Sequence, residues 1–375
     1  MRPSVRSSAP LPGASAPGQP APAPLPSPRL LPGTYGENNV AMRITVLAGG
    51  LGGARFLHGV RALLGIEAGP GPTNAEPDGI TVVGNTGDDL WLFGLKVCPD
   101  LDTIMYSLGG GLDEERTWGR AAETFIAAEE LRAYGAQPDW FGLGDRDIGT
   151  HLMRTQLLEA GYPLSAVTAA LCQRWQPGVR LLPMTDDRVE THVVITDDQG
   201  RRAIHFQEWW VRLHAEVAAE KFVMVGADEA TPGPGVVEAI MTADVVLLPP
   251  SNPVVSIGAI TSVPGIATAL GRTEAPVIGV SGLVSGAPVR GMADACLSAI
   301  GVEPRAGAVA LHYAARPTGF LDGWLVDIAD AGEVDEVVAA GIACRAVPTM
   351  MTDRAAAAAL VGAGLDMAAE LRSGR

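Results

Sequence analysis

Alternation of short β-branched segments with helical segments constrains the fold of this chain more than any other feature of its sequence. The segment 42–65, MRITVLAGGLGGARFLHGVRALLG, reads as a strand, a glycine turn and a helix with apolar residues at helical spacing. Further strands are predicted at 79–85, 222–228, 244–250, 276–282 and 323–329, with helices that include 235–243 and 291–301. This order predicts an α/β fold: a Rossmann-like, mostly parallel sheet with helices on both faces and functional loops at its carboxyl edge.

Residues from about 104 to 215 interrupt this alternation and are predicted to form an insertion that covers the sheet edge. Its first part is predicted to be largely helical, with apolar faces in the segments 120–135, 147–161 and 163–175. Its last part, 190–210, is predicted to form a β-hairpin that turns at 197–200.

The first 41 residues differ in composition from the rest of the chain. They are rich in Pro, Ala and Ser and lack apolar periodicity, so we predict a disordered tail at 1–41 before one folded domain at 42–375. Translation that starts at Met42 is an alternative explanation of this segment.

Charge and composition argue against several classes of partner. The formal net charge of −15 argues against binding to nucleic acid or to anionic membranes, because both need clustered Lys and Arg. No uninterrupted apolar stretch reaches the roughly 20 residues of a membrane span. The four cysteines are scattered without zinc-ligand spacing, which predicts a reduced, cytoplasmic protein.

Four glycines, Gly49, Gly50, Gly52 and Gly53, follow the first predicted strand and open its helix. Glycine lets backbone N–H groups approach a ligand closely, and the N-terminus of a helix attracts phosphate. Neither standard nucleotide motif is complete, because Arg55 replaces the third glycine of a dinucleotide fingerprint and the P-loop Lys and Ser/Thr are absent. We interpret the loop as an anion site assisted by Arg55; the alternative is a tight turn without a ligand.

Four aspartates, Asp88, Asp89, Asp100 and Asp102, flank a short apolar run after the second predicted strand. Crowded carboxylates repel one another, and a hard cation such as Mg²⁺ cancels this repulsion when it binds their oxygens. We predict Asp88 and Asp100 as metal ligands and catalytic residues, with Asp102 and the nearby Asn85 as substrate contacts. The alternatives are exposed loop acids and, for Asp100, a helix N-cap.

Three further segments combine polar groups with turn or strand signals. Arg146 stands between two aspartates in GLGDRD and is predicted as a catalytic residue that binds phosphate or carboxylate; a structural ion-pair network is the alternative. Ser251 and Asn252 lie between prolines in PPSNP and are predicted to form a rigid polar turn that contacts a nucleotide, although a turn alone also explains them. His205 begins HFQEWW, whose alternation predicts either half-buried strand packing or an aromatic, hydrogen-bonding wall for a heterocycle.

In this order, the motifs GGLGGARFLHG, NTGDDLW, PDLDT, LGDRD, HFQEWW and PSNPVVSIG resemble those of the 2-phospho-L-lactate transferase family of coenzyme F420 biosynthesis. The resemblance runs from about residue 42 to the C-terminus. One departure is GGLGGARF in place of the family's GGTGTPKL, so Arg55 has to supply the charge of the missing Lys. The segment 279–291 also departs from the family's pattern. The GGxGGARF variant together with FQEWWVR is similar to the branch taken to use an enolpyruvyl donor.

The resemblance implies a homodimer that binds Fo, a deazaflavin riboside, and a guanosine diphosphate ester of enolpyruvate or lactate. It implies that the phosphoester moiety moves to the terminal ribityl hydroxyl of Fo with Mg²⁺, releasing GMP. The family's acceptor-binding and metal-binding aspartates correspond to Asp88 and to Asp100 with Asp102, and its GDRD arginine corresponds to Arg146.

A function of another class is the alternative. A regulatory protein related to gluconeogenesis factors would share the glycine-rich first loop, bind a nucleotide sugar and catalyse nothing. An NAD-dependent oxidoreductase is disfavoured by Arg55 at the third fingerprint position.

Overall fold

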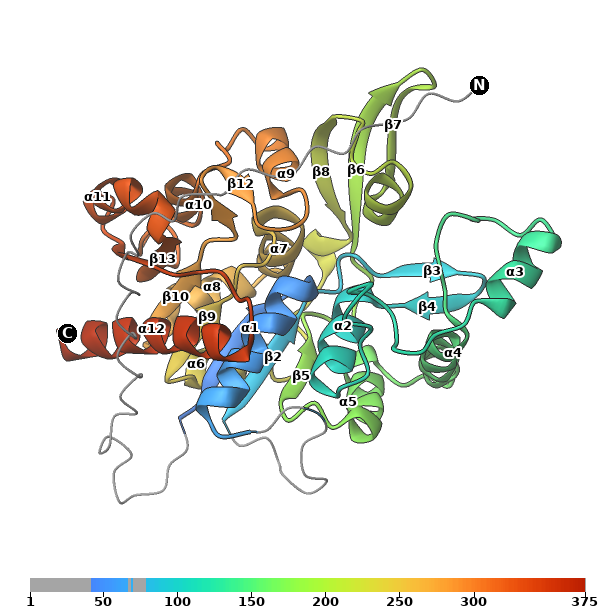
Figure 1. Ribbon diagram of the computed structural model, residues 1–375, viewed down its shortest axis with the longest axis horizontal. Coiled ribbons are helices and arrows are strands. Elements are labelled where there is room, and N and C mark those ends of the chain that lie inside the picture. Colours follow the sequence, from blue (N-terminus) through green and yellow to red (C-terminus); the bar gives the residue numbers. More distant parts are fainter. Residues whose placement is uncertain (1–41, 67–68, 70–78, 375) are drawn as a thin grey trace, which may run out of the picture. The chain divides into compact units, whose positions relative to one another are not determined.

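Seven parallel strands form the central sheet of the protein (Figure 1). The computed structural model describes residues 42–66, 69 and 79–374, so the tail predicted at 1–41 lies outside the described residues. In spatial order the strands are β14 (Ala343–Val347), β13 (Gly323–Asp327), β10 (Val277–Val280), β9 (Val245–Leu248), β1 (Ile44–Ala48), β2 (Ile80–Gly84) and β5 (Arg180–Pro183). The predicted α/β fold with a parallel sheet is confirmed.

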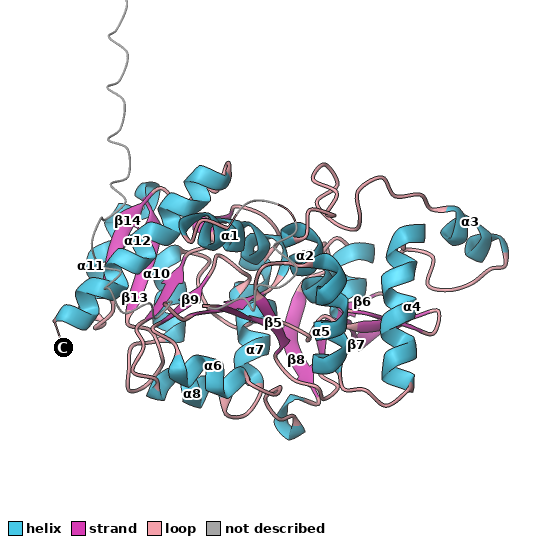
Figure 2. Cartoon of the chain, turned by 90° about the horizontal axis from the view of Figure 1, so that it is seen from below, coloured by secondary structure: helices cyan, strands magenta, loops and turns pink. Residues whose placement is uncertain are grey.

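Helices cover both faces of this sheet (Figure 2). One core contains side chains of α1 (Gly50–Leu63), α2 (Pro99–Leu108), α5 (Leu164–Trp175) and α12 (Arg354–Ser373). The other contains side chains of α6 (Val236–Thr242), α7 (Ala259–Ser262), α8 (Ile266–Arg272), α9 (Ala293–Ala299), α10 (Ala306–Tyr313) and α11 (Val334–Ala339). Successive residues of a strand point to opposite faces, which is why Val46 and Leu47 of β1 belong to different cores. The helices predicted at 235–243 and 291–301 are confirmed as α6 and α9.

The order of the strands reverses beside β1. From β1 the chain proceeds to β2 and β5 on one side, and it returns to the other side of β1 with β9. Ligands of open parallel sheets bind outside the carboxyl ends of the strands at such a reversal. The fold therefore brings the loop after β1 and the loop after β9 together at the position expected for a ligand.

The range predicted as an insertion contains several kinds of structure. The hairpin β3 (Leu90–Leu92) and β4 (Leu95–Val97) precedes it, and α3 (Ile126–Ala133), α4 (Asp145–Glu159) and α5 lie within it. The helix predicted at 120–135 covers only Ile126–Ala133. Strand β5, also within this range, is the edge strand of the main sheet.

A second, antiparallel sheet stands beside the main one. It consists of β7 (Gly200–His205), β6 (Glu190–Asp197) and β8 (Ala219–Val225), in that order. The predicted hairpin is confirmed as β6 and β7. The strand predicted at 222–228 exists as β8, but it pairs with β6 and does not join the parallel sheet.

The prediction that HFQEWW forms a half-buried strand is wrong. Strand β7 ends at His205, and Glu208–Arg212 form a helical turn. The turn buries Trp209 completely, and its indole N–H donates to the Val217 carbonyl at 2.7 Å. A buried indole needs both an apolar environment and an acceptor, and the helical turn provides them where a strand was expected.

The remaining short elements connect these layers. They are β11 (Leu283–Val284), which pairs with β12 (Ala287–Pro288), and helical turns at Ala227–Glu229, Pro253–Gly258 and Ile328–Glu333. Within the described residues no single helix is long and apolar enough to cross a membrane, and only the bent pair Pro253–Ser262 with Ile266–Arg272 reaches that length and apolarity together.

Close packing of α1 on α12 predicts the effect of a single methyl group. A Cβ on Gly59 would lie 2.5 Å from the backbone C and O atoms of Ala357. We expect Gly59→Ala to lower the free energy of unfolding by about 2 kcal/mol, because the backbone of α12 cannot yield without shifting the helix. Urea denaturation measures this change.

Gly362 of α12 provides the matched control, because no atom lies within 4 Å of the position of its Cβ. Gly362→Ala should leave the protein as stable or up to about 1 kcal/mol more stable, since alanine favours helix. Equal denaturation midpoints for the two variants would contradict the packing argument.

Candidate active site

A large cavity lies at the carboxyl edge of the parallel sheet. Its volume is about 1020 Å³, at the upper end of the roughly 300–1,000 Å³ of ligand pockets, so two medium-sized substrates fit. The predicted site residues that line it are Gly49, Gly50, Gly52, Arg55, Asp88, Asp100, Asp102, Ser251 and Asn252. Those that are not among the lining residues are Gly53, Asn85, Arg146 and His205.

The loops after β1 and β9 are joined by a reciprocal contact. The N–H of Gly49 donates to Ser251 Oγ at 3.3 Å, and that hydroxyl donates to the Gly49 carbonyl at 2.9 Å. A Cβ on Gly49 would lie 2.5 Å from Asp100 Oδ2, and one on Gly52 would lie 2.6 Å from the Pro250 carbonyl oxygen. Only glycine permits these approaches, so the backbone of the loop lies directly against its neighbours.

Three further predicted residues have distinct roles: Gly53 and Arg55 lie in the first turns of α1, and Asn252 lies in the loop after β9. Gly53 lies inside, where a Cβ would meet Ala48 Cβ at 2.8 Å, so it allows α1 to pack on β1. Asn252 Oδ1 accepts hydrogen bonds from the N–H groups of Val254 and Val255 at 2.9 and 3.1 Å, and thereby caps the next helical turn. Arg55 is exposed on the cavity wall. The N-terminus of α1 and Arg55 thus provide positive potential at this end.

Asp88 and Asp100 line the cavity from the loop after β2 and the first turn of α2. Asn85 donates from Nδ2 to Asp100 Oδ2 at 2.9 Å and to the Val255 carbonyl at 3.1 Å, which fixes the Asp100 carboxylate. Burial, and then the charge of Asp100, raise the pKa of Asp88 well above its usual value. Burial raises the pKa of Asp100 to about 6. In the described part of the chain, no nearby cationic side chain offsets the burial of these two carboxylates, which is why their pKa values are raised.

The Asp88 and Asp100 carboxylates fit a hard divalent cation. Asp88 Oδ1 is buried, and it has no hydrogen-bond partner among the described residues. The same part of the chain contains no group of three or more His, Cys, Asp or Glu side chains that could hold a metal. The protein would therefore supply two carboxylates, and substrate oxygens and water would complete the shell, as is usual for Mg²⁺.

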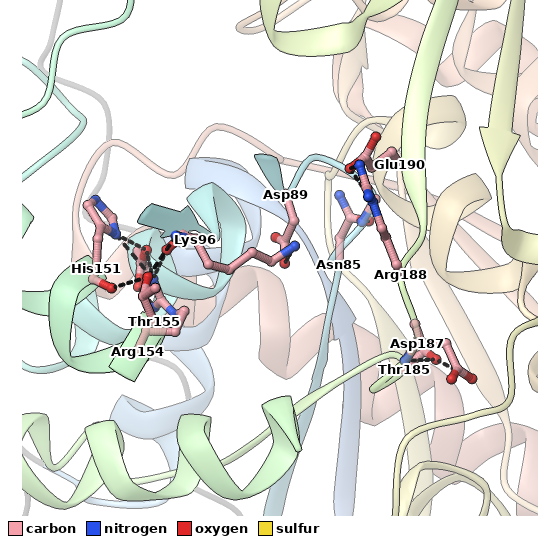
Figure 3. A network of polar contacts seen from close by, with 12 residues as sticks. Asn85, Asp89, Lys96, His151, Arg154, Thr155, Thr185, Asp187, Arg188 and Glu190 are labelled. Carbon is pink, nitrogen blue, oxygen red and sulfur yellow. Dashed lines mark hydrogen bonds and ion pairs between the residues drawn. The ribbon is translucent and has the colours of Figure 1, made fainter. Parts of the chain in front are cut away.

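Asp89 is compensated separately from Asp88. Its Oδ2 lies 3.2 Å from Lys96 Nζ, and the two side chains are 2% and 10% exposed. His205 Nε2 lies 3.2 Å from the Asp89 carbonyl oxygen, to which it donates in the matching tautomer. Figure 3 shows the Lys96 side chain extending toward Asp89. His205 thus supports the acidic turn and does not line the cavity.

A chain of hydrogen bonds joins α2 to α4 beside the cavity. Arg154 binds both carboxylate oxygens of Asp102 and also donates to His151 Nδ1 at 3.2 Å. With Nδ1 as acceptor, the His151 proton is on Nε2, which lies 3.3 Å from Asp147 Oδ2. Tyr106 OH donates to Asp147 Oδ1 at 2.6 Å. Asp102, predicted as a substrate contact, is therefore held in a buried ion pair.

Asp147, His151 and Arg154 are not among the site residues predicted from the sequence. They recur at i, i+4 and i+7 along α4, so polar side chains follow one face of a helix, and all three are buried. The motif DRDIGTHLMR carries this spacing. The signal was present, but a polar face on a helix ordinarily predicts exposure to solvent.

Arg146 lies next to this network but outside the cavity. Its side chain is exposed, and its backbone N–H donates to Glu123 Oε1 at 2.6 Å while its carbonyl accepts from Arg120 at 2.9 Å. The catalytic role expected for the Arg146 side chain stays a prediction. The carboxylate of Asp147, one residue later, lines the cavity.

Aromatic side chains from two segments form part of the cavity wall. The insertion contributes Trp118, Trp140 and Phe141, and the segment after β7 contributes Phe206 and Trp210. Aromatic faces provide large apolar contacts for planar heterocycles. The lining of the cavity therefore combines aromatic side chains with the glycine loop and carboxylates.

Comparison with known proteins identifies the family. A family model described as 2-phospho-L-lactate transferase CofD matches residues 44–352. The chain belongs to the CofD family. The predicted family resemblance is thereby confirmed, and so is the prediction of a transferase enzyme.

Relatives of this CofD family member are similar over most of its length. Proteins named phosphoenolpyruvate transferase from Streptomyces griseus and Thermobifida fusca are each 62% identical to it, over 333 and 331 residues. Each match covers 88% of this chain, and 100% and 99% of the respective relative. The protein of the same name from Mycolicibacterium smegmatis is 60% identical over 331 residues, covering 87% of this chain and 99% of the relative.

Solved structures share the fold of this CofD family member at low sequence identity. A crystal structure of protein BH3568 from Bacillus halodurans has a TM-score of 0.50 at 16% identity and covers 82% of this chain and 93% of that chain. A second structure, described as a member of the upf0052 family (bh3568), has a TM-score of 0.54 at 16% identity, with coverage of 87% and 99%. At this identity the likeness concerns the fold alone.

The buried Asp102–Arg154 pair predicts a large loss of stability when one partner is removed. We expect Arg154→Met to lower the free energy of unfolding by about 3–5 kcal/mol, because Asp102 would remain buried without a cation. The pair Arg201–Glu220 is the control, since its side chains are 68% and 40% exposed. Arg201→Met should leave the urea midpoint unchanged. A change below about 1 kcal/mol in Arg154→Met would contradict a net role for the pair.

The raised pKa of Asp100 predicts a pH-dependent stability of the metal-free protein. The folded protein retains a proton on Asp100 up to a pKa of about 6, whereas the unfolded chain releases it near the ordinary value of 3.8. This contribution is full below about pH 4 and is lost as the pH rises through about 6. Denaturation in chelator from pH 4 to 7 should show the decline, and Asp100→Asn should flatten it. An identical pH profile for the variant would rule this origin out.

Proposed function

We propose that this protein transfers a phosphoenolpyruvyl moiety from a guanosine diphosphate ester to the terminal ribityl hydroxyl of Fo, releasing GMP, in coenzyme F420 biosynthesis. The observation that carries the proposal is the position of Asp88 and Asp100 beside the glycine loop in one cavity. Transfer between a diphosphate and a hydroxyl needs both substrates in one site and charge stabilisation around the phosphorus. The cavity volume of about 1020 Å³ supports simultaneous binding.

We propose Mg²⁺ as the cofactor, held by Asp88 and Asp100. When bound, the cation neutralises charge that develops on the diphosphate oxygens. The chain's own residues bind and orient the donor around it. The start of α1 and Arg55 both line the cavity, and backbone N–H groups and a guanidinium suit phosphate oxygens.

The choice of donor rests on the relatives. Proteins at 60–62% identity are named phosphoenolpyruvate transferase, which favours an enolpyruvyl donor for this chain. The family model bears the name of the lactyl enzyme, so the 2-phospho-lactyl donor is the other arm of the test. The aromatic wall suits the planar ring system of the acceptor.

Oligomeric state and location follow from the family resemblance and composition. We propose a homodimer in the cytoplasm, in agreement with cysteines that are all free. Light scattering coupled to size exclusion tests the dimer.

The proposed reaction is tested by mixing protein, Fo, Mg²⁺ and either donor and weighing the products. We expect transfer from the enolpyruvyl donor and GMP release in equal amounts. Asp88→Asn and Asp100→Asn should each lower kcat by on the order of 100-fold, because the proposed Mg²⁺ that neutralises transition-state charge would lose a carboxylate ligand. Asp366→Asn, an exposed aspartate of α12, is the control and should retain full activity.

Two results would contradict the proposed function. Unchanged kcat in both site variants would remove the carboxylates from catalysis. Absence of turnover with either donor, together with tight binding of a nucleotide sugar, would favour the non-catalytic alternative.

A further inference from the structure

The carboxylates of the cavity are not equivalent. Asp88 and Asp100 have raised pKa values and fit a cation, and Asp102 is bound on both oxygens by Arg154. The remaining carboxylate, Asp147, accepts a hydrogen bond from Tyr106 and lies near His151, but no Lys or Arg among the described residues forms an ion pair with it. It lines the same cavity, with 13% of its side chain exposed. Asp147 is thus the carboxylate with capacity for a substrate hydroxyl.

Tyr106 donates a hydrogen bond to the Asp147 carboxylate, and His151 lies close to its other oxygen. Tyr106 OH of α2 lies 2.6 Å from Oδ1, and His151 Nε2 lies 3.3 Å from Oδ2. His151 is itself held by Arg154 at 3.2 Å, and Arg154 is anchored by Asp102. An ionised carboxylate can accept about four hydrogen bonds, so these two contacts leave acceptor capacity on a residue that lines the cavity. The arrangement is that of a preorganised acceptor.

The surrounding charges keep Asp147 ionised. Burial alone would raise its pKa, but hydrogen bonds from His151 and Tyr106 and the nearby Arg154 lower it below the usual value. Tyr106 stays protonated, because burial and the charges of Asp102 and Asp147 raise its pKa.

The other charged groups around Asp147 come from the segment before α3. The Asp147 N–H donates to Glu123 Oε2 at 3.1 Å, and the Arg120 guanidinium lies 5.9 Å from the Tyr106 ring. Neither Glu123 nor Arg120 binds the Asp147 carboxylate oxygens in these contacts. The two oxygens can therefore still accept hydrogen bonds from a ligand.

The neighbours of Asp147 indicate which substrate it meets. Trp140 and Phe141 precede α4 by a few residues and line the cavity, as does Trp118. The phosphate-type groups, which are the glycine loop and Arg55, come from the loop after β1 and from α1. Asp147 follows this aromatic segment in the chain, and its carboxylate can accept a hydrogen bond from a hydroxyl group. Together they suit a ligand in which a planar ring carries a polyol chain.

We infer that Asp147 is a catalytic residue that accepts a hydrogen bond from the attacking hydroxyl of the acceptor and orients it toward the donor phosphorus. This inference rests on the proposed function. A bond forms between the acceptor oxygen and phosphorus, the bond from that phosphorus to the GMP oxygen breaks, and the hydroxyl proton passes to Asp147 and then to water. A carboxylate of low pKa suffices, because the proton leaves late in a loose transition state.

Asp147→Asn tests the role in steady-state kinetics with Fo and the donor. We expect kcat to fall by on the order of 100-fold while the KM of the donor changes less than about two-fold, because the donor lies elsewhere in the cavity. Titration of Fo fluorescence should show that the variant still binds the acceptor, and thermal melting should show that it is folded. Glu159→Gln, an exposed acid at the end of the same helix, is the control and should match the wild type.

Chemical rescue separates catalysis from structural support. In Asp147→Ala, added formate should restore part of kcat because it supplies a carboxylate, whereas chloride at equal ionic strength should not. A kcat of Asp147→Asn within three-fold of the wild type overturns the inference, and so does an Asp147→Ala protein that binds Fo but gains nothing from formate. If the wild type itself fails to use Fo, the proposed function falls. If the wild type uses Fo and the Asp147 variants are as active as it is, the inference falls and the proposed function stands.

Discussion

The repulsion between Asp88 and Asp100, two buried carboxylates at the edge of a parallel sheet, is the constraint on which the rest of the site depends. The protein meets it only in part. An amide from Asn85 and the backbone N–H of Gly50 bind Asp100, and Asp88 retains a buried oxygen without a partner among the described residues. Neutralisation is therefore left to what binds in the cavity, and this couples the charge of the site to its ligands.

The neighbouring aspartates are stabilised by different means, each from another element. Asp89 is paired with Lys96 of β4, and Asp102 with Arg154 of α4. Lys96 also connects these two regions, because its N–H donates to Thr155 Oγ1 at 2.8 Å and its carbonyl accepts from Arg154 at 3.3 Å (Figure 3). Buried charges are tolerated when paired and hydrogen-bonded, so the acidic stretch can enter the interior without unfolding it.

The sequence predicted those features that are local. Strand and helix periodicities are read within a few residues, which is why the parallel sheet and α1, α6 and α9 were predictable. The pairing of β8 with β6 was not, because an apolar run carries no information about its partner strand. Asp88 could be singled out because it directly follows a buried strand.

Residues whose role depends on tertiary contacts escaped prediction. Arg146 and Asp147 are adjacent in GDRD, and on charge alone the arginine is the stronger candidate for a phosphate ligand. Consecutive residues of a helix face different directions, and in α4 the side chain that lines the cavity is that of Asp147. The role of His151 and Arg154 depends on contacts between α4 and α2, which are distant in the sequence. Their burial, and not their spacing, distinguishes them from an ordinary polar face.

The position of β1 in the sheet has a consequence for the folding of the chain during its translation. Gly49 and its partner Ser251 are 202 residues apart in the chain. Synthesis at about 5–20 residues per second separates their emergence by roughly 10–40 s, during which β1 can pair with β2 but not with β9. The nascent chain therefore carries an open strand edge with apolar residues on both faces, and such an edge invites association with other chains. Chaperone capture is to be sought in this interval of translation, after β2 emerges and before β9 does.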